Sequence, residues 1–349
     1  MIDVAQLAGV SPAAVSRAFT PGASISQHKR QAVLEAAKIL RYRPNLLARS
    51  LITGRSRIIG IVLTHFDNQF YPALIQELSI ALGASGYRTL LFMTDISKDP
   101  ESVIEELLRY QVDAVILGSV ALSDRSAEAC RSAGVPTLLI NHKTDSLYIS
   151  SITSDNFHAA RVVAAFLVAG GHKSFGMVAG LGNTSASRDR ESGFFSYLRE
   201  QKMPEPARAV GYYSYEGARS AARQLLSAKD RPEAVFCGND HMALAFIGVA
   251  RHEYGLTIGQ DISVVGFDDA PIAAWPDFSL TTYSQPVAMI VSETVGALQS
   301  MLENLDQAPI RAVIHGELIV RGSARTPRTG IMEVNGQLIW RPGPKFDKG

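Results

Sequence analysis

The segment "SPAAVSRAF" (residues 11–19) decides the fold of the N-terminal part of the chain. Ser11 is suited to begin a helix, because its hydroxyl can accept a hydrogen bond from a backbone N–H of the first turn. Pro12 fits that first turn, where its missing N–H would have no partner. Val15 and Phe19 lie four residues apart and therefore share one face of the helix. The segment predicts a short helix of small residues with an apolar inner face and an arginine outside.

Helical spacing extends on both sides of this segment. Upstream, Val4, Leu7 and Ala8 recur at helical intervals, and Gly9 stands where a glycine ends a helix. Downstream, the pattern predicts a third helix over about residues 27–40. Its predicted apolar face consists of Val33, Leu34, Ala37 and Leu40. Two short helices across a glycine-containing turn, with a third behind them, predict an all-α helix-turn-helix domain.

A helix of this kind can enter the major groove of DNA. The groove is about 12 Å wide, so small residues such as Pro12 and Ala13 suit the leading end of the helix. Arg17 can pair with guanine through two hydrogen bonds, and Ser16 can reach a phosphate or a base. The predicted DNA-facing residues are Ser11, Pro12, Ala13, Ser16 and Arg17. The alternative is an ordinary helical cap with a merely solvated arginine.

The charge distribution supports a polyanionic partner for the N-terminal part. The 349-residue chain has a net charge of +1, yet residues 1–57 hold nine Lys or Arg and two Asp or Glu. That segment therefore carries +7, and the rest of the chain carries −6. A basic head on a mildly acidic body is typical of a nucleic-acid-binding protein.

Other sequence features exclude several classes of protein. Cys130 and Cys237 have neither a CxxC motif nor zinc-ligand spacing, so reduced thiols in a cytoplasmic protein are expected. No long apolar run predicts a membrane span, and the N-terminus lacks the pattern of a signal sequence. The sequence holds no P-loop, HExxH or GxSxG motif, and its histidines lack metal-ligand spacing. We expect no catalytic residue, cofactor or metal.

From Arg57 onward, short apolar runs alternate with helical segments, which predicts buried parallel strands in βαβ units. One series comprises RIIGIVLT, RTLLFMT, AVILGS and TLLIN, and a second comprises SFGMVAG, RAVGYYS, AVFCGN and ISVVGFDD. Two series predict two lobes, each with a doubly wound parallel sheet. Ligands of such sheets bind beyond the carboxyl ends of the strands, which here is also the cleft between lobes.

Two stretches, "DVAQLAGVSPAAVSRAF" (3–19) and "RYRPNLLARSLITGRSRIIGIV" (41–62), resemble the lactose/galactose repressor family of bacterial transcription regulators. The resemblance continues to about residue 323 and implies four parts. These are a helix-turn-helix domain (1–43), a hinge helix and linker (44–56), a two-lobe core like the periplasmic binding proteins (57–323) and a departing tail (324–349). Members usually carry several residues before this first segment. Either the true start lies upstream of Met1, or the first helix is shortened.

The resemblance also implies how the hinge works. One hinge helix from each subunit of a homodimer enters the minor groove, where Leu51 wedges into the central base step and Ala48 lies on the same face. Asn45 is predicted to contact DNA as well. A helix of about eight residues is not stable alone in water, so the hinge is expected to form on DNA. The alternative is that Leu47 and Leu51 form a core stripe.

For the cleft, the resemblance implies an effector held by residues matching Arg190, Asn239, Asp268 and, in some members, Gln285. Phe70 and Trp275 are predicted to be aromatic walls. The full predicted set is Phe70, Ser119, Arg190, Tyr213, Asn239, Asp268, Trp275 and Gln285. The expected ligand is a small polar molecule, a sugar or a sugar acid.

Two residues of the cleft region leave alternatives open. Asp240 follows a strand and begins a helix, so it is equally suited to cap that helix. His158 either points into the cleft, which would favour a sugar acid, or is a partly exposed helix residue.

Three functions compete for this pattern. A periplasmic sugar-binding protein is disfavoured by the basic helical head and the missing signal sequence, and an enzyme by the absent motifs. A DNA-binding protein without effector response is disfavoured by Arg190, Asn239 and Asp268. We therefore expect an effector-controlled repressor that binds double-stranded operator DNA as a homodimer, without a membrane. In the tail, Asn335–Gly336 predicts a β-hairpin, and no leucine heptad predicts a tetramerisation helix.

Overall fold

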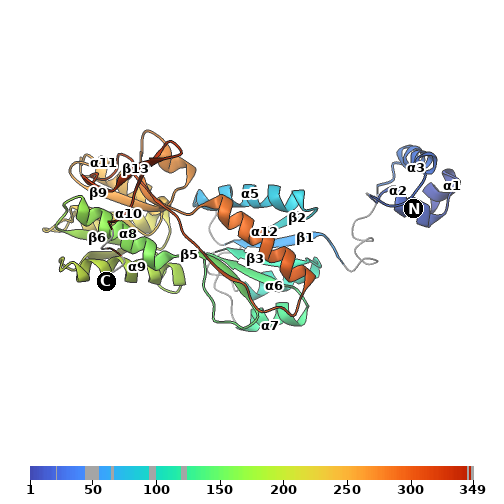
Figure 1. The fold of residues 1–349 in the computed structure, drawn as a ribbon, viewed down its shortest axis with the longest axis horizontal. Coiled ribbons are helices and arrows are strands. Elements are labelled where there is room, and N and C mark those ends of the chain that lie inside the picture. Colours follow the sequence, from blue (N-terminus) through green and yellow to red (C-terminus); the bar gives the residue numbers. More distant parts are fainter. Residues whose placement is uncertain are drawn as a thin grey trace. The chain divides into compact units, whose positions relative to one another are not determined.

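The structure, a computed structural model, describes residues 1–20, 22–43, 55–63, 67–93, 100–118, 124–343 and 346. It divides into two compact units, a head of residues 1–56 and a body of residues 57–349 (Figure 1). The predicted hinge residues Asn45, Leu47, Ala48 and Leu51 lie outside the described residues, as does Ser119.

The head consists of three helices, α1 (Ile2–Leu7), α2 (Pro12–Ala18) and α3 (Gln27–Ile39). Ser11 begins α2 as predicted, because its hydroxyl accepts a hydrogen bond of 3.3 Å from the Ala14 amide. Gly9, between α1 and α2, has a φ of +61°, a conformation that favours glycine. The predicted helix-turn-helix is therefore present.

Small residues fill the core of the head. The buried cluster consists of Val4, Ala5, Val15, Ala18, Val33, Ala36 and Ala37, and Ala14 is buried beside it. The prediction that Leu34 and Leu40 belong to the apolar inner face of the third helix is wrong, since these side chains are 42% and 43% exposed. Alanine lets the short helices approach closely, and the longer leucine side chains remain at the surface.

Lobe 1 of the body is built on a six-stranded sheet in the order β11-β5-β4-β3-β1-β2. Its strands are β1 (Ile58–Leu63), β2 (Arg88–Met93), β3 (Ala114–Gly118), β4 (Thr137–Ile140), β5 (Ser150–Ser154) and β11 (Arg311–Ile314). One apolar cluster lies between this sheet and α5 (Phe70–Ala84) and α12 (Val287–Glu303). A second cluster lies on the side of α6 (Pro100–Arg109) and α7 (Asp124–Ser132). All of these strand pairs are parallel, as the continuous apolar runs predict.

Lobe 2 is built on an eight-stranded sheet in the order β13-β14-β12-β10-β9-β8-β6-β7. Its central strands are β6 (Phe175–Ala179), β7 (Ala207–Val210), β8 (Ala234–Cys237), β9 (Ser263–Asp268) and β10 (Thr281–Ser284). α8 (Asn156–Ala169) and α9 (Ser185–Glu200) contribute to one apolar cluster of this lobe. α10 (Tyr215–Leu226) and α11 (Asp240–His252) contribute to the other, and a short 3-10 helix, η1 (Pro271–Ala274), follows β9.

The tail completes the sheet of lobe 2. β13 (Ile331–Val334) and β14 (Gln337–Trp340) form the predicted antiparallel hairpin, and β14 pairs with β12 (Leu318–Ile319). Asn335 and Gly336 at the turn both have positive φ, of +50° and +76°. Trp340 is buried edge-on against Phe166 of α8. Residues 324–340 are therefore part of the body, and no structural boundary separates them from the preceding chain.

Candidate functional site

The outer face of α2 is the candidate DNA-contacting surface of the head. Ala14, Val15 and Ala18 turn inward and are buried. The five predicted residues are all exposed: Ser11, Pro12, Ala13, Ser16 and Arg17. The helix thus separates a packing face from a face that can meet another molecule.

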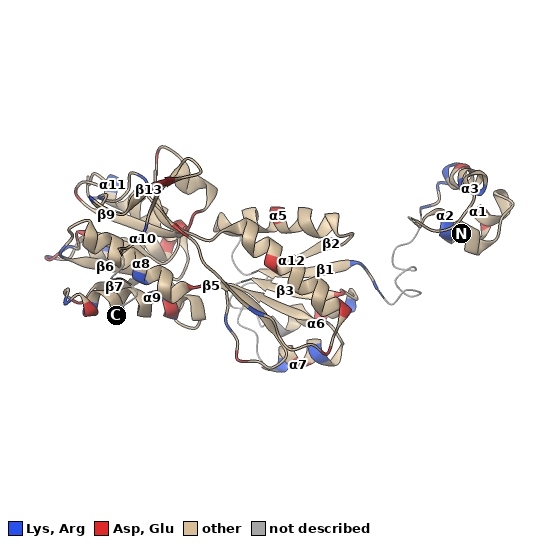
Figure 2. Ribbon diagram, viewed as in Figure 1, with Lys and Arg blue, Asp and Glu red and all other residues tan. Residues whose placement is uncertain are grey.

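Two arginines of the head have different surroundings. Arg30 donates from Nη1 to the Ala18 carbonyl at 2.8 Å and from Nη2 to the Ala23 carbonyl at 3.2 Å, which ties α3 to the end of α2. Arg17 is exposed, and its hydrogen bond from Nε to the Ala13 carbonyl is long, at 3.4 Å. It borders a groove that is also lined by Gln6, Ser11, Ser24, Ser26 and Lys29. Positions of Lys and Arg occur on α2 and α3 (Figure 2), and Arg17 and Lys29 both line this groove, so it suits phosphate oxygens and base edges.

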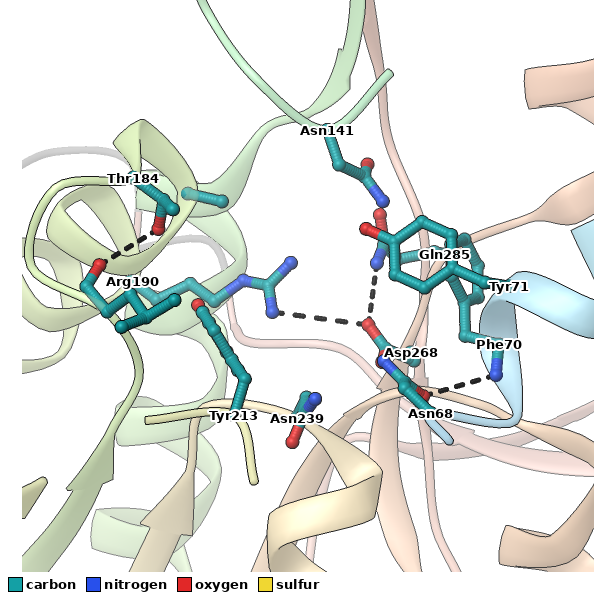
Figure 3. A pocket seen from close by; sticks show the side chains of 12 residues that line it. Asn68, Phe70, Tyr71, Asn141, Thr184, Arg190, Tyr213, Asn239, Asp268 and Gln285 are labelled. Atoms are coloured by element: carbon teal, nitrogen blue, oxygen red, sulfur yellow. Dashed lines mark hydrogen bonds and ion pairs between the residues drawn. The ribbon is translucent and has the colours of Figure 1, made fainter. Parts of the chain in front are cut away.

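The candidate ligand site is a cavity between the two lobes of the body (Figure 3). It holds about 550 Å³ of empty space, part of which is open to solvent. The cavity is lined by Asn68, Phe70, Tyr71, Asn141, Leu181, Thr184, Ala186, Arg190, Tyr213, Asn239, Asp268 and Gln285. Most of these residues lie just after the carboxyl end of a strand or in the first turns of the following helix, as expected for such sheets.

Arg190 is the buried cation of the cavity and is held on several sides. Its Nε donates to Asn156 Oδ1 at 2.8 Å, and its Nη1 donates to the Gly238 carbonyl at 2.6 Å. The guanidinium also lies 3.5 Å above the centre of the Phe267 ring. Nη2 has no hydrogen-bond partner among the described residues. A guanidinium fixed in this way can offer its remaining donors to a ligand with little loss of entropy.

Asp268 is the buried anion of the cavity. Its Oδ1 accepts a hydrogen bond of 2.6 Å from Gln285 Nε2 and lies 4.0 Å from Arg190 Nη1, and its Oδ2 accepts from Asn68 Nδ2 at 3.2 Å (Figure 3). Burial raises the pKa of this carboxyl, while Arg190 and the two amide donors oppose that rise. Asp268 has a φ of +126°, a strained conformation for a residue with a side chain. The carboxylate therefore links lobe 2 to Asn68 of lobe 1 and to Gln285.

Asn239 caps α11 and lines the cavity, whereas Asp240 takes neither of the two roles that its position leaves open in the sequence. Asn239 is the cap of α11, since its Oδ1 accepts a hydrogen bond of 2.9 Å from the Met242 amide, and it also lines the cavity. Asp240 is fully buried and accepts from the Ala270 amide at 2.8 Å and from Thr282 Oγ1 at 2.6 Å. Burial and the neighbouring negative charge of Asp268 raise the pKa of Asp240. Asp240 thus anchors the loop after β9.

Aromatic and small apolar side chains form the remaining wall. Phe70 and Tyr71 begin α5, are buried, and meet edge to face with ring centres 5.4 Å apart. Tyr213 has a φ of +56°, and its ring lies so close to Gly180 that a side chain at that glycine would collide with it. Ring faces beside hydrogen-bonding groups suit a ligand that has both apolar faces and hydroxyl groups.

The structure brings together six of the eight predicted ligand-site residues. They are Phe70, Arg190, Tyr213, Asn239, Asp268 and Gln285. Trp275 is a correction: it follows directly after η1, its side chain is 57% exposed to solvent, and it does not line the cavity. His158 also lies outside the cavity lining, with its ring near His315 and Phe346, which agrees with a partly exposed helix residue.

The predicted set lacks six residues that line the cavity, namely Asn68, Tyr71, Asn141, Leu181, Thr184 and Ala186, and it also lacks Asn156, which holds Arg190. Asn68 and Asn141 follow β1 and β4, and the rule that ligands bind beyond strand ends indicates Asn68 in the sequence and could have found Asn141 as well. Asn141 Oδ1 is buried without a hydrogen-bond partner among the described residues. Thr184 caps α9, which the pattern of a hydroxyl residue before a helix could have indicated. Asn156, which orients Arg190, carries no signal in the sequence.

The described residues give little support to a metal site, a reactive thiol or a membrane-spanning helix. No group of three or more His, Cys, Asp or Glu side chains in the described ranges could hold a metal ion. Cys130 and Cys237 are unpaired thiols, and burial raises the pKa of both, which disfavours the reactive thiolate. Within the same ranges, every helix is too short or too polar to cross a membrane.

Comparison with known proteins gives separate family matches for the head and for the body. Residues 1–45 match the model of bacterial regulatory proteins of the lacI family, and residues 164–324 match that of periplasmic binding protein-like domains. The HTH-type transcriptional regulator GalS of Salmonella typhimurium (strain LT2) is 33% identical over 310 residues, which cover 87% of this chain and 90% of GalS.

Solved structures give similar matches over nearly the whole chain. The lac repressor dimer bound to operator and the anti-inducer ONPF has a TM-score of 0.81 and 27% identity, with coverage of 92% of this chain and 97% of that chain. The complex of the transcriptional regulator CelR with cellobiose has a TM-score of 0.71 and 27% identity, with coverage of 92% and 98%.

Proposed function

This chain belongs to the lacI family of bacterial regulatory proteins, and on that premise we propose that it is a repressor released from its operator by a sugar or sugar acid. Its membership makes it a DNA-binding transcription regulator and not an enzyme. We propose that it acts in the cytoplasm, at the nucleoid when it is bound to operator.

The observation that carries the proposal is the pairing of Arg190 and Asp268 in a buried cavity between the lobes. Their side chains are nearly inaccessible to solvent and lie 4.0 Å apart at the closest N–O approach. Amides and aromatic rings surround them, a combination that suits a small molecule with several hydroxyl groups. The similar CelR was solved with cellobiose, which supports a carbohydrate as the ligand class.

On the DNA side, we propose that the exposed face of α2 reads one half of a near-palindromic operator. Arg17 contacts a guanine, while Ser11, Pro12, Ala13 and Ser16 contact base edges and phosphates. The hinge residues Asn45, Ala48 and Leu51 contact the centre of the operator. These roles follow from the family pattern and from the exposure of the α2 residues.

We propose that the protein works as a homodimer, as the lac repressor does in its complex with operator. In lobe 1, α5 and α12 pack against each other and both contribute to one core cluster. Ile80 on α5 and Met289 on α12 nevertheless remain 61% and 52% exposed. Large apolar side chains that stay exposed on neighbouring helices are suited to an interface with a second copy.

Control by a ligand requires different ligand affinities in two arrangements of the body. Asp268 accepts hydrogen bonds from Asn68 of lobe 1 and from Gln285 between the lobes. A ligand that engages Asp268 and Arg190 therefore changes the contacts that join the lobes. In this proposal, that change is passed on to the paired hinge helices and weakens operator binding.

Thermal-shift measurements on the full chain test the ligand, with ribose, cellobiose and galacturonate as neutral and acidic probes. Fluorescence anisotropy with DNA from upstream of the coding region then tests the operator. We expect at least one probe to raise the melting temperature and to weaken DNA binding. Tight DNA binding that no stabilising sugar alters would contradict the proposed control. An absence of specific DNA binding would contradict the repressor itself.

A further inference from the structure

Three segments of chain connect the lobes: residue 155, residues 285–286 and residues 315–317. Hydrogen bonds join them to one another. The Asp155 amide donates to the Ile314 carbonyl at 3.0 Å, and Ser154 Oγ donates to Gln285 Oε1 at 2.8 Å. The Ser284 amide donates to the Glu317 carbonyl at 2.8 Å, and the Glu317 amide donates back to Ser284 Oγ at 2.9 Å. Any change in the arrangement of the lobes therefore acts on these bonds.

The third connecting segment runs directly against the second. A side chain at Gly316 would collide with the Ser284 carbonyl, so only glycine permits this approach. Because the two segments are in contact here, a movement of the Gly316 peptide is transmitted to Ser284, at the end of β10.

A continuous stack of side chains leads from the cavity toward this point. The Arg190 guanidinium lies 3.5 Å above the centre of the Phe267 ring. The Phe267 ring in turn stacks on Tyr283, with ring centres 5.4 Å apart and an angle of 26° between the planes. Phe267 and Tyr283 are paired residues of the parallel strands β9 and β10, which holds the rings in register.

Tyr283 ends the stack with two hydrogen bonds to Gly316. Its hydroxyl donates to the Gly316 carbonyl at 2.8 Å and accepts from the Gly316 amide at 3.2 Å. Tyr283 is 3% exposed and does not line the cavity. A buried phenol that is hydrogen-bonded to both the carbonyl and the amide of one residue fixes that residue's position more firmly than apolar packing does.

We propose that Tyr283 is a positioning residue that couples the Arg190 guanidinium to the third connecting segment. A role of Tyr283 in effector response rests on the function proposed for the cavity. The coupling between Arg190 and Gly316 does not depend on that function. When a ligand draws Arg190 across the ring of Phe267, Tyr283 moves with that ring and shifts Gly316. Asp268 contacts the second connecting segment directly, through its hydrogen bond from Gln285. Arg190 is thus coupled to the third connecting segment and Asp268 to the second.

Amide hydrogen exchange on the full chain, without ligand or DNA, tests this coupling. The reporters are the amides of Ser284 and Glu317, which join the second and third segments. In the otherwise unaltered protein, we expect Arg190→Met to accelerate their exchange by about three- to thirtyfold. In the Tyr283→Phe background, Arg190→Met should accelerate the exchange of these amides by less than about twofold. The ring at position 283 remains there, but its hydrogen bonds to Gly316 are lost.

Tyr254→Phe is the matched control, since the Tyr254 hydroxyl also donates to a backbone carbonyl, that of Arg223, away from the cavity. In that background Arg190→Met should act as it does in the unaltered protein. If Arg190→Met does not fold, Phe267→Leu replaces it, because this change breaks the stack and leaves the guanidinium. Equal acceleration with and without the Tyr283 hydroxyl would overturn the coupling. That result would leave the repressor proposal standing, since its own tests use sugars and operator DNA.

Discussion

The five candidate residues on the exposed face of α2 lie in one continuous stretch, residues 11–17. The residues that line the cavity come from many separate segments between residues 68 and 285. On α2, a cap at Ser11 and the helical period are enough to separate inner from outer side chains. In the cavity, Arg190 depends on Asn156 of α8, Gly238 just after β8 and Phe267 of β9. Local surfaces of the first kind tolerate changes elsewhere in the chain, and assembled sites of the second kind do not.

The largest effect that this comparison predicts comes from the tail. Trp340 is 4% exposed, packs on Phe166 and donates from Nε1 to the Thr329 carbonyl at 2.9 Å. Trp340→Ala should lower the free energy of unfolding of the body by about 3–5 kcal/mol, because it leaves a cavity in the core of lobe 2. Denaturant unfolding measures the loss. Leu338→Ala in the same strand, where the side chain is 49% exposed, should change stability by less than about 0.5 kcal/mol. Equal losses would mean that the tail is not part of the core.

The second prediction concerns the cavity itself. Arg190→Met should weaken binding of the stabilising sugar by about ten- to a hundredfold, because charged hydrogen bonds to the ligand are lost. Titration calorimetry measures the affinity. Arg188→Met is the control, since this exposed arginine lies two residues earlier on α9 and does not line the cavity. A comparable loss in both variants would argue against a direct contact from Arg190.

The third prediction concerns the head. Arg17→Ala should weaken operator binding by about 1–3 kcal/mol and relax sequence preference at one base pair. Its effect on stability should be small, since the side chain is exposed. Lys38→Ala removes an exposed charge near the end of α3 and should weaken binding to operator and unrelated DNA alike. Anisotropy with both DNAs separates these outcomes, and an unchanged sequence preference in Arg17→Ala would refute the base contact.

The smallest predicted effect is a pH dependence of the body. His172 is buried between the Leu167 carbonyl and Ser263 Oγ, and burial lowers its pKa from 6.5. The unfolded chain then binds a proton near neutral pH that the folded chain does not bind, so stability falls as the pH drops below about 6.5. One such group changes the free energy of unfolding by at most about 1.4 kcal/mol per pH unit.

Melting temperatures at pH 7.5 and pH 5.5 check this sign. Burial also lowers the pKa of His142 and His241, so His172→Gln should reduce the difference between the two temperatures without abolishing it. An undiminished difference in that variant would assign the pH dependence to other groups.

Much of the fold was predictable from local patterns. The cap at Ser11, the alternation of apolar runs with helices and the Asn335–Gly336 turn each depend on residues only a few positions apart. Resemblance to a family then indicated Arg190, Asn239, Asp268 and Gln285, and position after a strand end indicated Phe70 and Tyr213; all six line the cavity. The errors have physical causes. Leucines expected on the inner face of the third helix stay outside because alanines bring the helices together, and Trp275, directly after η1, turns to solvent.

The sequence by itself determined the helix-turn-helix, the two series of strands and the hairpin, because helical period, strand hydrophobicity and turn chemistry act over short distances. Only the tertiary structure decided that Asn239 caps α11 while Asp240 anchors a loop, and that Asn156 orients Arg190. It alone set Tyr283 between the cavity and Gly316. Apart from the local Asn239 cap, these contacts join residues far apart in the chain, and their geometry depends on how strands and helices pack after each has formed.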